Sequence, residues 1–346
     1  MKILSSPTLA QLSEFDEIID VRSPSEFAID HIPEAINCPV LNDDERAKVG
    51  TIYVQESPFL AKKTGAAIVS RNIARHLEES FIDKPKSWRP LVYCWRGGKR
   101  SGAMAHVLAE IGWQTVRLDG GYKAYRKMVL ESLESLPGRY EFRVICGETG
   151  CGKSRLLEAL SKIGAQVLDL EKMARHRGSV LGKMPGIEQP GQKYFESSIW
   201  FSLSGFDPGK PVYIESESRK IGDLRVPQSL MDAMWKSPSI RLHAEIEKRC
   251  MMLFEDYEHF FSLPEALNDR LACLTMLHGR ETIESWQAMV DNKAWESLVQ
   301  SLLENHYDRA YRKSLANHYG DGIPVYEVSD ISESGFLTLA SKIQAV

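Results

Sequence analysis

Residues Gly147 to Ser154 read Gly-Glu-Thr-Gly-Cys-Gly-Lys-Ser, which is the full pattern of a phosphate-binding loop. An apolar run precedes this segment, and leucines at helical spacing follow it. Glycines let several backbone N–H groups turn toward one anion, and the N-terminus of the following helix adds a favourable dipole. The lysine supplies a positive charge, and the serine hydroxyl can bind Mg²⁺. We therefore predict a polyphosphate site formed by Gly147, Thr149, Gly150, Cys151, Gly152, Lys153 and Ser154.

A second segment with reactive side chains begins at Cys94, directly after the apolar run 91–93. Backbone amides of a short loop, a helix N-terminus and three nearby cations all favour the thiolate form of this cysteine. An accessible thiolate is a nucleophile and can carry a second chalcogen atom. Three cations within five residues also argue against a buried, inert thiol. We predict that Cys94 is catalytic and that its loop binds an anion through Trp95, Arg96, Gly97, Gly98, Lys99 and Arg100.

The remaining cysteines show no pattern typical of a metal site. Cys38, Cys146, Cys250 and Cys273 lie in apolar surroundings, which predicts core positions, and Cys151 reads as a small side chain inside the phosphate loop. No pair has Cys-x-x-Cys spacing and the histidines do not gather near cysteines, so we predict no zinc site and assign no metal ligand. Magnesium at the phosphate loop stays open, because the strand 212–214 is followed by Glu215 where Asp is more usual.

Alternating strands and helices predict an α/β fold in two domains. Strands are expected at 17–21, 91–93 and 115–118, with helices at 65–76 and 101–111, where Met104, Val107, Leu108 and Ile111 share one face. This alternation indicates a doubly wound parallel sheet. Leu136-Pro137-Gly138 marks a boundary, which gives domains 1–136 and 137–346. In the second domain we expect strands at 142–146, 167–170, 212–215 and 325–328, and a mainly helical part at 244–314.

Composition is that of an ordinary globular chain. The sequence has 346 residues, 43 % apolar and 26 % charged, with a formal net charge of −4. This balance excludes a disordered or low-complexity protein, and no apolar stretch approaches the ~18 residues of a membrane span. Six cysteines without an apolar leader fit reduced thiols, so we expect a cytoplasmic protein that does not bind membranes.

The first domain resembles the rhodanese family. Asp20-Val21-Arg22, Glu26-Phe27 and the run 31–37 match the opening motifs of that family, Cys94 falls at the position of its sulfur-carrying cysteine, and Gly120-Gly121 matches its closing glycine pair. The resemblance implies a rhodanese-like parallel sheet. Asp20, Arg22 and His31 could be read as an acid–base set, but such groups more often join loops through charged hydrogen bonds, and we expect that structural role.

The whole chain resembles the bacterial tRNA 2-selenouridine synthases, in which a rhodanese-like domain is fused to a phosphate-loop domain. Besides the two loops, the segments 169–179, 189–193 and 215–222 match motifs of the second domain of that family. The resemblance implies a P-loop NTPase-like α/β domain with a helical C-terminal part. It also implies a further site in that domain, at Asp169, Arg177, Glu215 and Arg219.

This resemblance further implies a transferase that converts 2-thiouridine at the wobble position of tRNA into 2-selenouridine. Geranyl diphosphate first alkylates the sulfur, and selenium from selenophosphate then replaces the S-geranyl group. The phosphate loop suits the first step, and Cys94 suits the second as a selenium-bearing residue. Expected partners are the anticodon stem-loop of tRNA and a selenophosphate supplier.

A tRNA partner requires basic and aromatic side chains at the surface. Lys123, Arg126 and Lys127 near the first loop, and Lys172, Arg175, His176, Arg177 and Lys183 in the second domain, could contact phosphates. Arg309, Arg312 and Lys313 at helical spacing are as well explained by a solvated helix. Trp95 or Tyr122 could stack on an extruded base.

Three other functions stay open from the residues alone. Cys94 and Arg100 have the spacing of a Cys-dependent phosphatase loop. A rhodanese-type sulfurtransferase coupled to an ATPase would use the same two loops. A non-enzymatic binding module is a third alternative, against which the cysteine in a cationic loop counts.

Overall fold

The computed structural model describes residues 2–4, 9–179, 181–183, 186–261, 263–309 and 322–345. The chain forms two compact units. The first comprises Met1–Glu134 and Pro190–Gly205, and the second comprises Ser135–Gln189 and Phe206–Val346. Among the described residues, no helix has the length and apolar character needed to cross a membrane.

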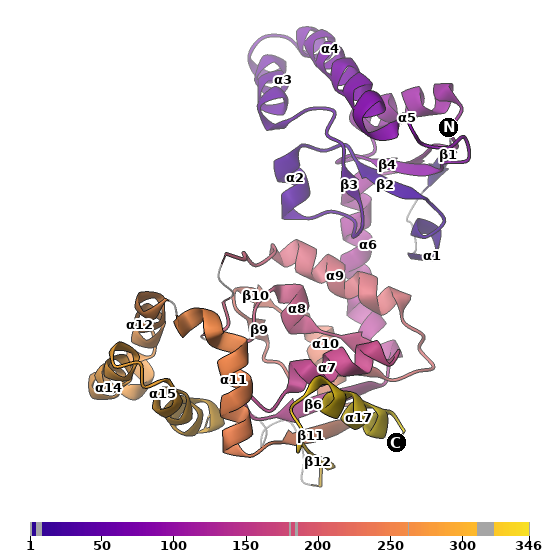
Figure 1. Ribbon diagram of the computed structural model, residues 1–346. Coiled ribbons are helices and arrows are strands. Elements are labelled where there is room, and N and C mark those ends of the chain that lie inside the picture. The colour runs from indigo at the N-terminus through magenta and orange to yellow at the C-terminus, as the bar shows by residue number, and fades with distance from the viewer. Residues whose placement is uncertain are drawn as a thin grey trace. The chain divides into compact units, whose positions relative to one another are not determined.

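The first unit is built on a five-stranded sheet in which every paired strand runs parallel, with the order β1-β5-β4-β2-β3 (Figure 1). Parallel neighbours need crossover connections, and helices supply most of them here. Strand β4 is in the middle of the sheet, so the loop that follows it leaves from the centre of the carboxyl edge. The strands are β1 (Lys2–Leu4), β2 (Glu17–Asp20), β3 (Ile36–Asn37), β4 (Pro90–Tyr93) and β5 (Val116–Leu118).

Helices cover both faces of this sheet, as predicted for a doubly wound fold. Ile73 of α4 and Met104 and Leu108 of α5 are buried in one cluster with Val92 of β4, and Figure 1 shows α6 on the opposite face. The helices are α1 (Leu9–Leu12), α2 (Pro24–Ile29), α3 (Asp43–Gln55), α4 (Pro58–His76), which continues into the π-helical turn η1 (Leu77–Phe81), α5 (Lys99–Ile111), α6 (Gly121–Ser135) and α9 (Gln192–Gly205).

Helix α9 belongs to the first unit although it comes late in the sequence. Its Trp200 is 2 % exposed and meets Tyr125 of α6 edge to face, with the ring centroids 5.6 Å apart. Arg126 of α6 pairs with Glu196 and donates to the Lys193 carbonyl. Apolar burial and a partly buried ion pair therefore hold α9 against α6.

The second unit has its own five-stranded parallel sheet, with the order β12-β11-β6-β8-β7. Strand β6, which leads into the phosphate loop, is central and fully flanked. A separate antiparallel pair, β9 with β10, lies outside this sheet. The strands are β6 (Phe142–Gly147), β7 (Gln166–Leu168), β8 (Val212–Glu215), β9 (Lys220–Ile221), β10 (Leu224–Arg225), β11 (Ser239–His243) and β12 (Val325–Glu327).

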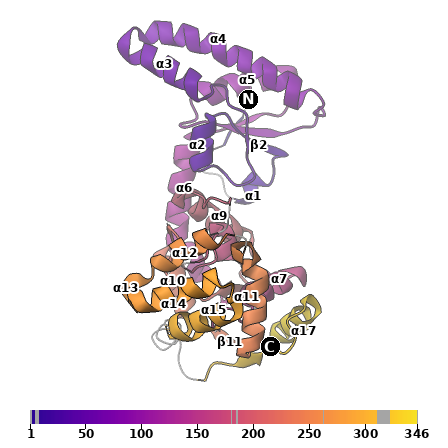
Figure 2. The same ribbon diagram turned by 60° about the vertical axis from the view of Figure 1, so that its left-hand side comes forward.

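The helices of this unit include two groups, of which α7 and α17 pack beside the sheet and α11, α12, α14 and α15 form a separate cluster. Leu156 and Leu160 of α7 share a core with Phe336 and Ile343 of α17, and Figure 2 shows α12, α14 and α15 gathered beside α11 around a second apolar cluster that contains Trp286. The helices are η2 (a 3₁₀ turn, Leu136–Arg139), α7 (Lys153–Lys162), α8 (Leu170–Ala174), α10 (Gln228–Trp235), α11 (Ile246–Phe261), α12 (Pro264–Ala272), α13 (Thr275–His278), α14 (Arg280–Asp291), α15 (Trp295–Leu302), η3 (a π-helical turn, Leu303–Tyr307) and α17 (Glu333–Gln344).

Several boundaries differ from the sequence predictions for identifiable reasons. The strand predicted at 167–170 ends at Leu168, because the Asp169 side chain caps α8 by accepting from the Lys172 N–H at 2.8 Å. Ile111, predicted on the buried face of its helix, is 51 % exposed because α5 ends there, before a left-handed Gly112. The helical part predicted at 244–314 is confirmed as far as the structure describes it, since residues 310–314 lie outside the described ranges, as do Arg312 and Lys313.

Replacing Trp200 with alanine should destabilise the first unit by about 3–5 kcal/mol, the usual cost of deleting a large buried aromatic side chain. The measurement is the free energy of unfolding in denaturant. Leu130→Ala is the control, because Leu130 on α6 is 47 % exposed and its loss should cost less than ~0.5 kcal/mol. Equal effects of the two changes would show that α9 is not held by this contact.

Candidate active sites

The sulfur of Cys94 lies directly after the central strand β4 and receives two hydrogen bonds. The Gly98 N–H donates to Sγ at 3.3 Å, and the Ser101 hydroxyl donates at 3.2 Å. Both donors come from the N-terminal region of α5, where backbone N–H groups lack helical partners. The residue is only 3 % exposed, so the expectation that nearby cations keep it out of the interior is wrong. Cys94 still lines an open pocket together with Trp95, Arg96, Gly98, Lys99 and Arg100.

Two glycines allow the active loop and the start of α6 to approach each other. Gly97 has φ +64°, and a Cβ there would lie 2.6 Å from the Leu118 carbonyl oxygen. Gly121 has φ +55°, and a Cβ there would overlap the Cys94 carbonyl oxygen, which accepts from the Tyr122 N–H at 2.8 Å. Only glycine fits both requirements, so the pair at 120–121 braces the cysteine loop.

The three cations of this loop are not equivalent. Arg100 donates to Glu26 at 2.7 Å in a largely buried pair, and Glu26 also pairs with Arg46. Arg96 and Lys99 are exposed at the pocket. Because Arg100 is held by a carboxylate, it is not placed as the phosphate-binding arginine that a Cys-dependent phosphatase needs.

Trp95 and Tyr122 stack on each other, with centroids 5.2 Å apart and an interplanar angle of 29°. Tyr122 is buried, donates its hydroxyl to Asp30 at 2.8 Å and carries the Arg22 guanidinium 4.0 Å above its ring. The Tyr122 ring is therefore already covered by Trp95 and Arg22, and the expectation that Tyr122 could stack on a base is wrong. Trp95 is half-buried and remains at the pocket.

Asp20 and Arg22 form a fully buried ion pair at 2.6 Å, and Arg22 also donates to the Asp30 carbonyl. His31 stacks on Phe27 at 3.7 Å, and burial lowers the pKa of its imidazole. These contacts join the loops after β2 and α2, which supports the structural role expected for the three residues.

In the second unit, the phosphate loop joins β6 to α7. The Lys153 ammonium donates to the Gly147 carbonyl at 2.8 Å, so it lies against the phosphate loop. Cys151, predicted as a small side chain inside the phosphate loop, is 1 % exposed and belongs to the core. The Ser154 hydroxyl donates to Glu171 Oε2 at 3.2 Å, which connects the loop to a group of carboxylates.

This carboxylate group consists of Glu171, Glu215 and Glu217, each with an oxygen within 4.8 Å of the others. Glu215 Oε1 accepts from the Glu171 N–H at 3.1 Å, whereas its buried Oε2 has no hydrogen-bond partner. Burial raises the pKa of all three groups, that of Glu217 to about 8, and repulsion from Glu171 adds to the rise at Glu215 and Glu217. Burial opposes the charged form of Lys153, but Cys151 and these carboxylates outweigh it and raise its pKa.

The four residues predicted for a second-domain site are only partly brought together. Glu215 belongs to the carboxylate group. Asp169 caps α8, and burial raises the pKa of its carboxyl. Arg177 pairs with Asp256 at 3.3 Å and lies over the Tyr257 ring. Arg219 is exposed on the segment before β9, and among the described residues no hydrogen bond or ion pair joins it to the carboxylates.

Arg249 of α11 is a site residue that the sequence does not reveal. It is 3 % exposed, its Nε donates to the Thr149 carbonyl at 2.8 Å, and it pairs with Glu148 and Asp308. It therefore fixes the phosphate loop from about a hundred residues away in the sequence. Glu171 and Glu217 were likewise not predicted as site residues. Their sequence signals are that each lies near the end of a strand and inside a segment, 169–179 or 215–222, that matches a motif of the second domain.

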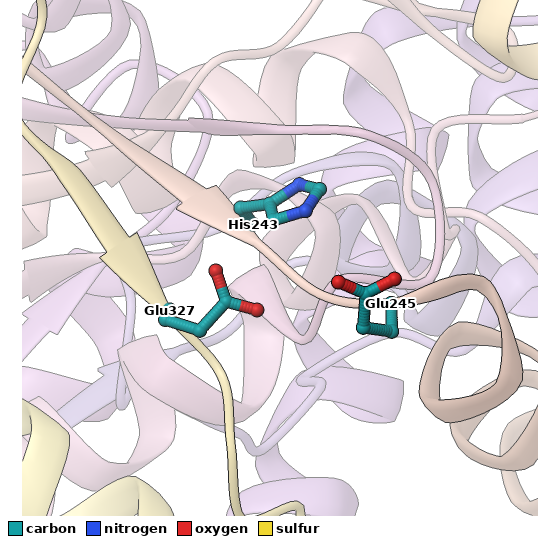
Figure 3. Close-up of side chains that lie close together, drawn as sticks. All are labelled: His243, Glu245 and Glu327. Carbon is teal, nitrogen blue, oxygen red and sulfur yellow. The ribbon is translucent and has the colours of Figure 1, made fainter.

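A second group of candidate metal ligands lies at the ends of β11 and β12, on the opposite side of β6 from β8. Figure 3 shows His243 at the end of β11 with Glu245 and Glu327 on either side, and their ligand atoms lie within 4.8 Å of one another. Both glutamates are exposed. Because exposed acidic groups commonly gather without an ion, this geometry by itself assigns no site.

The other cysteines mostly match the expectation of core positions. Cys38 and Cys146 are buried, and burial raises their thiol pKa values to about 12 and about 11. Cys250 is partly buried. Cys273 is exposed at the end of α12, so its predicted core position is wrong.

The pKa of Glu217, raised from its ordinary 4.5 to about 8, predicts a pH dependence of stability in the absence of divalent cations. Between pH 4.5 and about 8, the Glu217 carboxyl holds a proton in the folded state that it has lost in the unfolded state. The free energy of unfolding should therefore fall as pH rises through this range. Glu217→Gln should flatten this slope, with each unit of pKa shift worth about 1.4 kcal/mol. Denaturant unfolding across the window measures it, with the exposed Glu265→Gln as control. An unchanged slope in Glu217→Gln would contradict the assignment.

Two models of known protein families match successive parts of the chain. Residues 5–128 match the model of the rhodanese-like domain, and residues 140–263 match that of the tRNA 2-selenouridine synthase AAA domain. A protein of Alcanivorax borkumensis named tRNA 2-selenouridine synthase is 35 % identical over 335 residues, which cover 88 % of this chain and 90 % of the relative. One of Nitrosomonas europaea with the same name is 36 % identical over 244 residues, or 69 % of this chain and 63 % of the relative. The chain therefore belongs to the tRNA 2-selenouridine synthase family.

Proposed function

We propose that this protein is a cytoplasmic transferase that converts wobble 2-thiouridine of tRNA into 2-selenouridine in two steps. In the first, the sulfur attacks C1 of geranyl diphosphate, the C–O bond breaks, diphosphate leaves and the base loses its N3 proton. In the second, selenium from selenophosphate bonds to C2 of the base, the C2–S bond breaks and geranyl thiol leaves. Water takes the phosphoryl group of selenophosphate, and N3 regains a proton. The observation that carries the proposal is the presence of both anion-binding loops in a chain of this family.

The phosphate loop supports the first step. As the C–O bond breaks, negative charge grows on the departing diphosphate, and donors already placed around it lower the barrier. The loop amides, the α7 N-terminus and Lys153 are such donors, and Arg249 keeps the loop in position. No phosphoryl group has to be transferred in this step, so the loop acts by binding and charge stabilisation.

Magnesium fits the same place. Glu171, Glu215 and Glu217 with the Ser154 hydroxyl form an oxygen donor set, and the buried, unpartnered Glu215 Oε2 is a ligand atom without a proton donor. A bound Mg²⁺ would supply positive charge that offsets both the carboxylates and a diphosphate. The residues that would hold it are these three glutamates and Ser154.

The Cys94 pocket supports the second step. Two hydrogen bonds to the sulfur, and Arg96 and Lys99 at the pocket, suit an anionic chalcogen and the charge of selenophosphate. We therefore place selenium transfer at Cys94. Arg100 contributes by holding Glu26 and the loop rather than by binding the anion.

The anticodon stem-loop of tRNA is the proposed macromolecular partner, and a selenophosphate-producing enzyme is the proposed supplier. Lys123 and Lys127 on α6, and Lys172, Arg175 and Lys183, are exposed and available for phosphate contact. Arg126 and His176 are not, because Arg126 pairs with Glu196 and His176 is 7 % exposed.

Lys153→Ala should slow the formation of S-geranyl nucleoside by about 100-fold or more, the usual cost of removing one donor to a developing anion. The assay combines thiolated tRNA and geranyl diphosphate, followed by nucleoside mass spectrometry. Lys162→Ala is the control, since Lys162 lies at the far end of α7 and pairs with Glu158 and Glu333. An unchanged rate in Lys153→Ala would refute the role of the loop in geranyl transfer.

Cys94→Ser should leave geranylation intact and stop selenium transfer, so S-geranyl nucleoside accumulates when selenophosphate is added. We expect at least a 100-fold loss of 2-selenouridine, measured in the same assay, with the exposed Cys273→Ser as control. Normal selenouridine formation by Cys94→Ser would disprove the assignment. Cys94-dependent hydrolysis of an aryl phosphate, or ATP hydrolysis coupled to sulfur transfer from thiosulfate, would favour one of the two rival enzymes.

A further inference from the structure

An apolar cavity, partly open to solvent, lies beside the phosphate loop in the second unit. Its walls come from α11, α12, α15, the turn η3 and Leu181. Apart from Thr149 and two tyrosines, every lining side chain is aliphatic; the set includes Leu253, Leu267, Leu298, Val299, Leu302 and Leu303. The lining suits a hydrocarbon rather than a polar ligand.

The cavity adjoins the anion-binding loop directly. Thr149, a loop residue, is part of its wall. The next residue, Gly150, packs so closely on Leu253 that a Cβ there would lie 3.0 Å from the leucine side chain. A ligand held by the loop amides therefore has apolar side chains within reach.

A second connection joins the cavity to the carboxylate group. The Arg177 guanidinium lies 5.0 Å from the ring centroid of Tyr257, which lines the cavity. The adjacent Gly178 touches the carboxylates, since a Cβ there would lie 2.9 Å from oxygens of both Glu171 and Glu217. One short segment thus borders the polar site on one side and the apolar space on the other.

We propose that this cavity binds the hydrocarbon chain of a prenyl diphosphate whose diphosphate occupies the phosphate loop. The inference rests on the proposed geranyl transfer and assigns its substrate-binding site. A molecule with one dianionic or trianionic end and an apolar tail matches the two adjoining surfaces, whereas a nucleotide would place a polar sugar among leucines. Burial of each methylene favours binding by about 0.8 kcal/mol, so affinity should increase with the length of the hydrocarbon chain.

The test compares ten-carbon geranyl diphosphate with five-carbon dimethylallyl diphosphate. For the wild-type protein we expect kcat/KM for transfer to thiolated tRNA to favour the longer chain by at least about tenfold. Leu302→Phe and Val299→Phe fill the cavity and should reduce or reverse this preference. Leu271→Phe is the matched control, because Leu271 belongs to the same apolar cluster but does not line the cavity. The ratio of the two substrates is insensitive to a general loss of folded protein, which affects both equally.

Binding measurements separate this inference from the proposed function. Inorganic pyrophosphate and geranyl diphosphate are titrated into the wild-type protein and Leu302→Phe by calorimetry. We expect geranyl diphosphate to bind at least tenfold more tightly than pyrophosphate, and Leu302→Phe to remove that difference while pyrophosphate affinity is kept. Equal affinities in the wild type, or an unchanged difference in Leu302→Phe, would overturn the cavity assignment. Tight, cavity-dependent binding without any geranylation of tRNA would support the cavity and disprove the proposed reaction.

Discussion

Both candidate sites depend on backbone N–H groups that a helix leaves without partners at its N-terminus. In the first unit, β4 ends at the cysteine loop and α5 begins at Lys99; in the second, β6 ends at the phosphate loop and α7 begins at Lys153. Central strands of parallel sheets place these loops at the carboxyl edge, where ligands of α/β proteins bind. The same arrangement becomes two different sites because one loop presents a sulfur atom and the other an ammonium group.

Neither loop is held by local contacts alone. The cysteine loop is fixed by the start of α6, which approaches because residues 97 and 121 are glycines. The phosphate loop is fixed by Arg249, a buried guanidinium that needs Asp308 as its partner. Removing one member of a buried ion pair commonly costs about 3–5 kcal/mol, because the remaining charge is left uncompensated. The helical C-terminal part therefore contributes to the geometry of a loop that precedes it by more than a hundred residues.

The sequence predicts those features that depend on short, continuous segments of the chain. The phosphate loop, the cysteine loop and their flanking strands follow from local pattern and spacing, and so does the parallel direction of the strands. Arg249, Glu171 and Glu217 could not be predicted in the same way, because their roles arise from tertiary contact. Helix α9 shows the same limit: its sequence position follows β7, yet its Trp200 and Glu196 pack on α6.

The charge balance of the second site has a consequence for ligand choice. Three clustered carboxylates face one lysine beside a loop built for anions, so an added diphosphate increases an existing excess of negative charge. Protons on the glutamates or a divalent cation must offset that excess, which links anion affinity to pH and to Mg²⁺. An apolar tail adds binding free energy without adding charge, because its contribution comes from burial of surface. If the proposed cavity holds the tail, a diphosphate ester of a hydrocarbon should therefore bind more tightly than free pyrophosphate, which has only its contacts with the loop and Lys153.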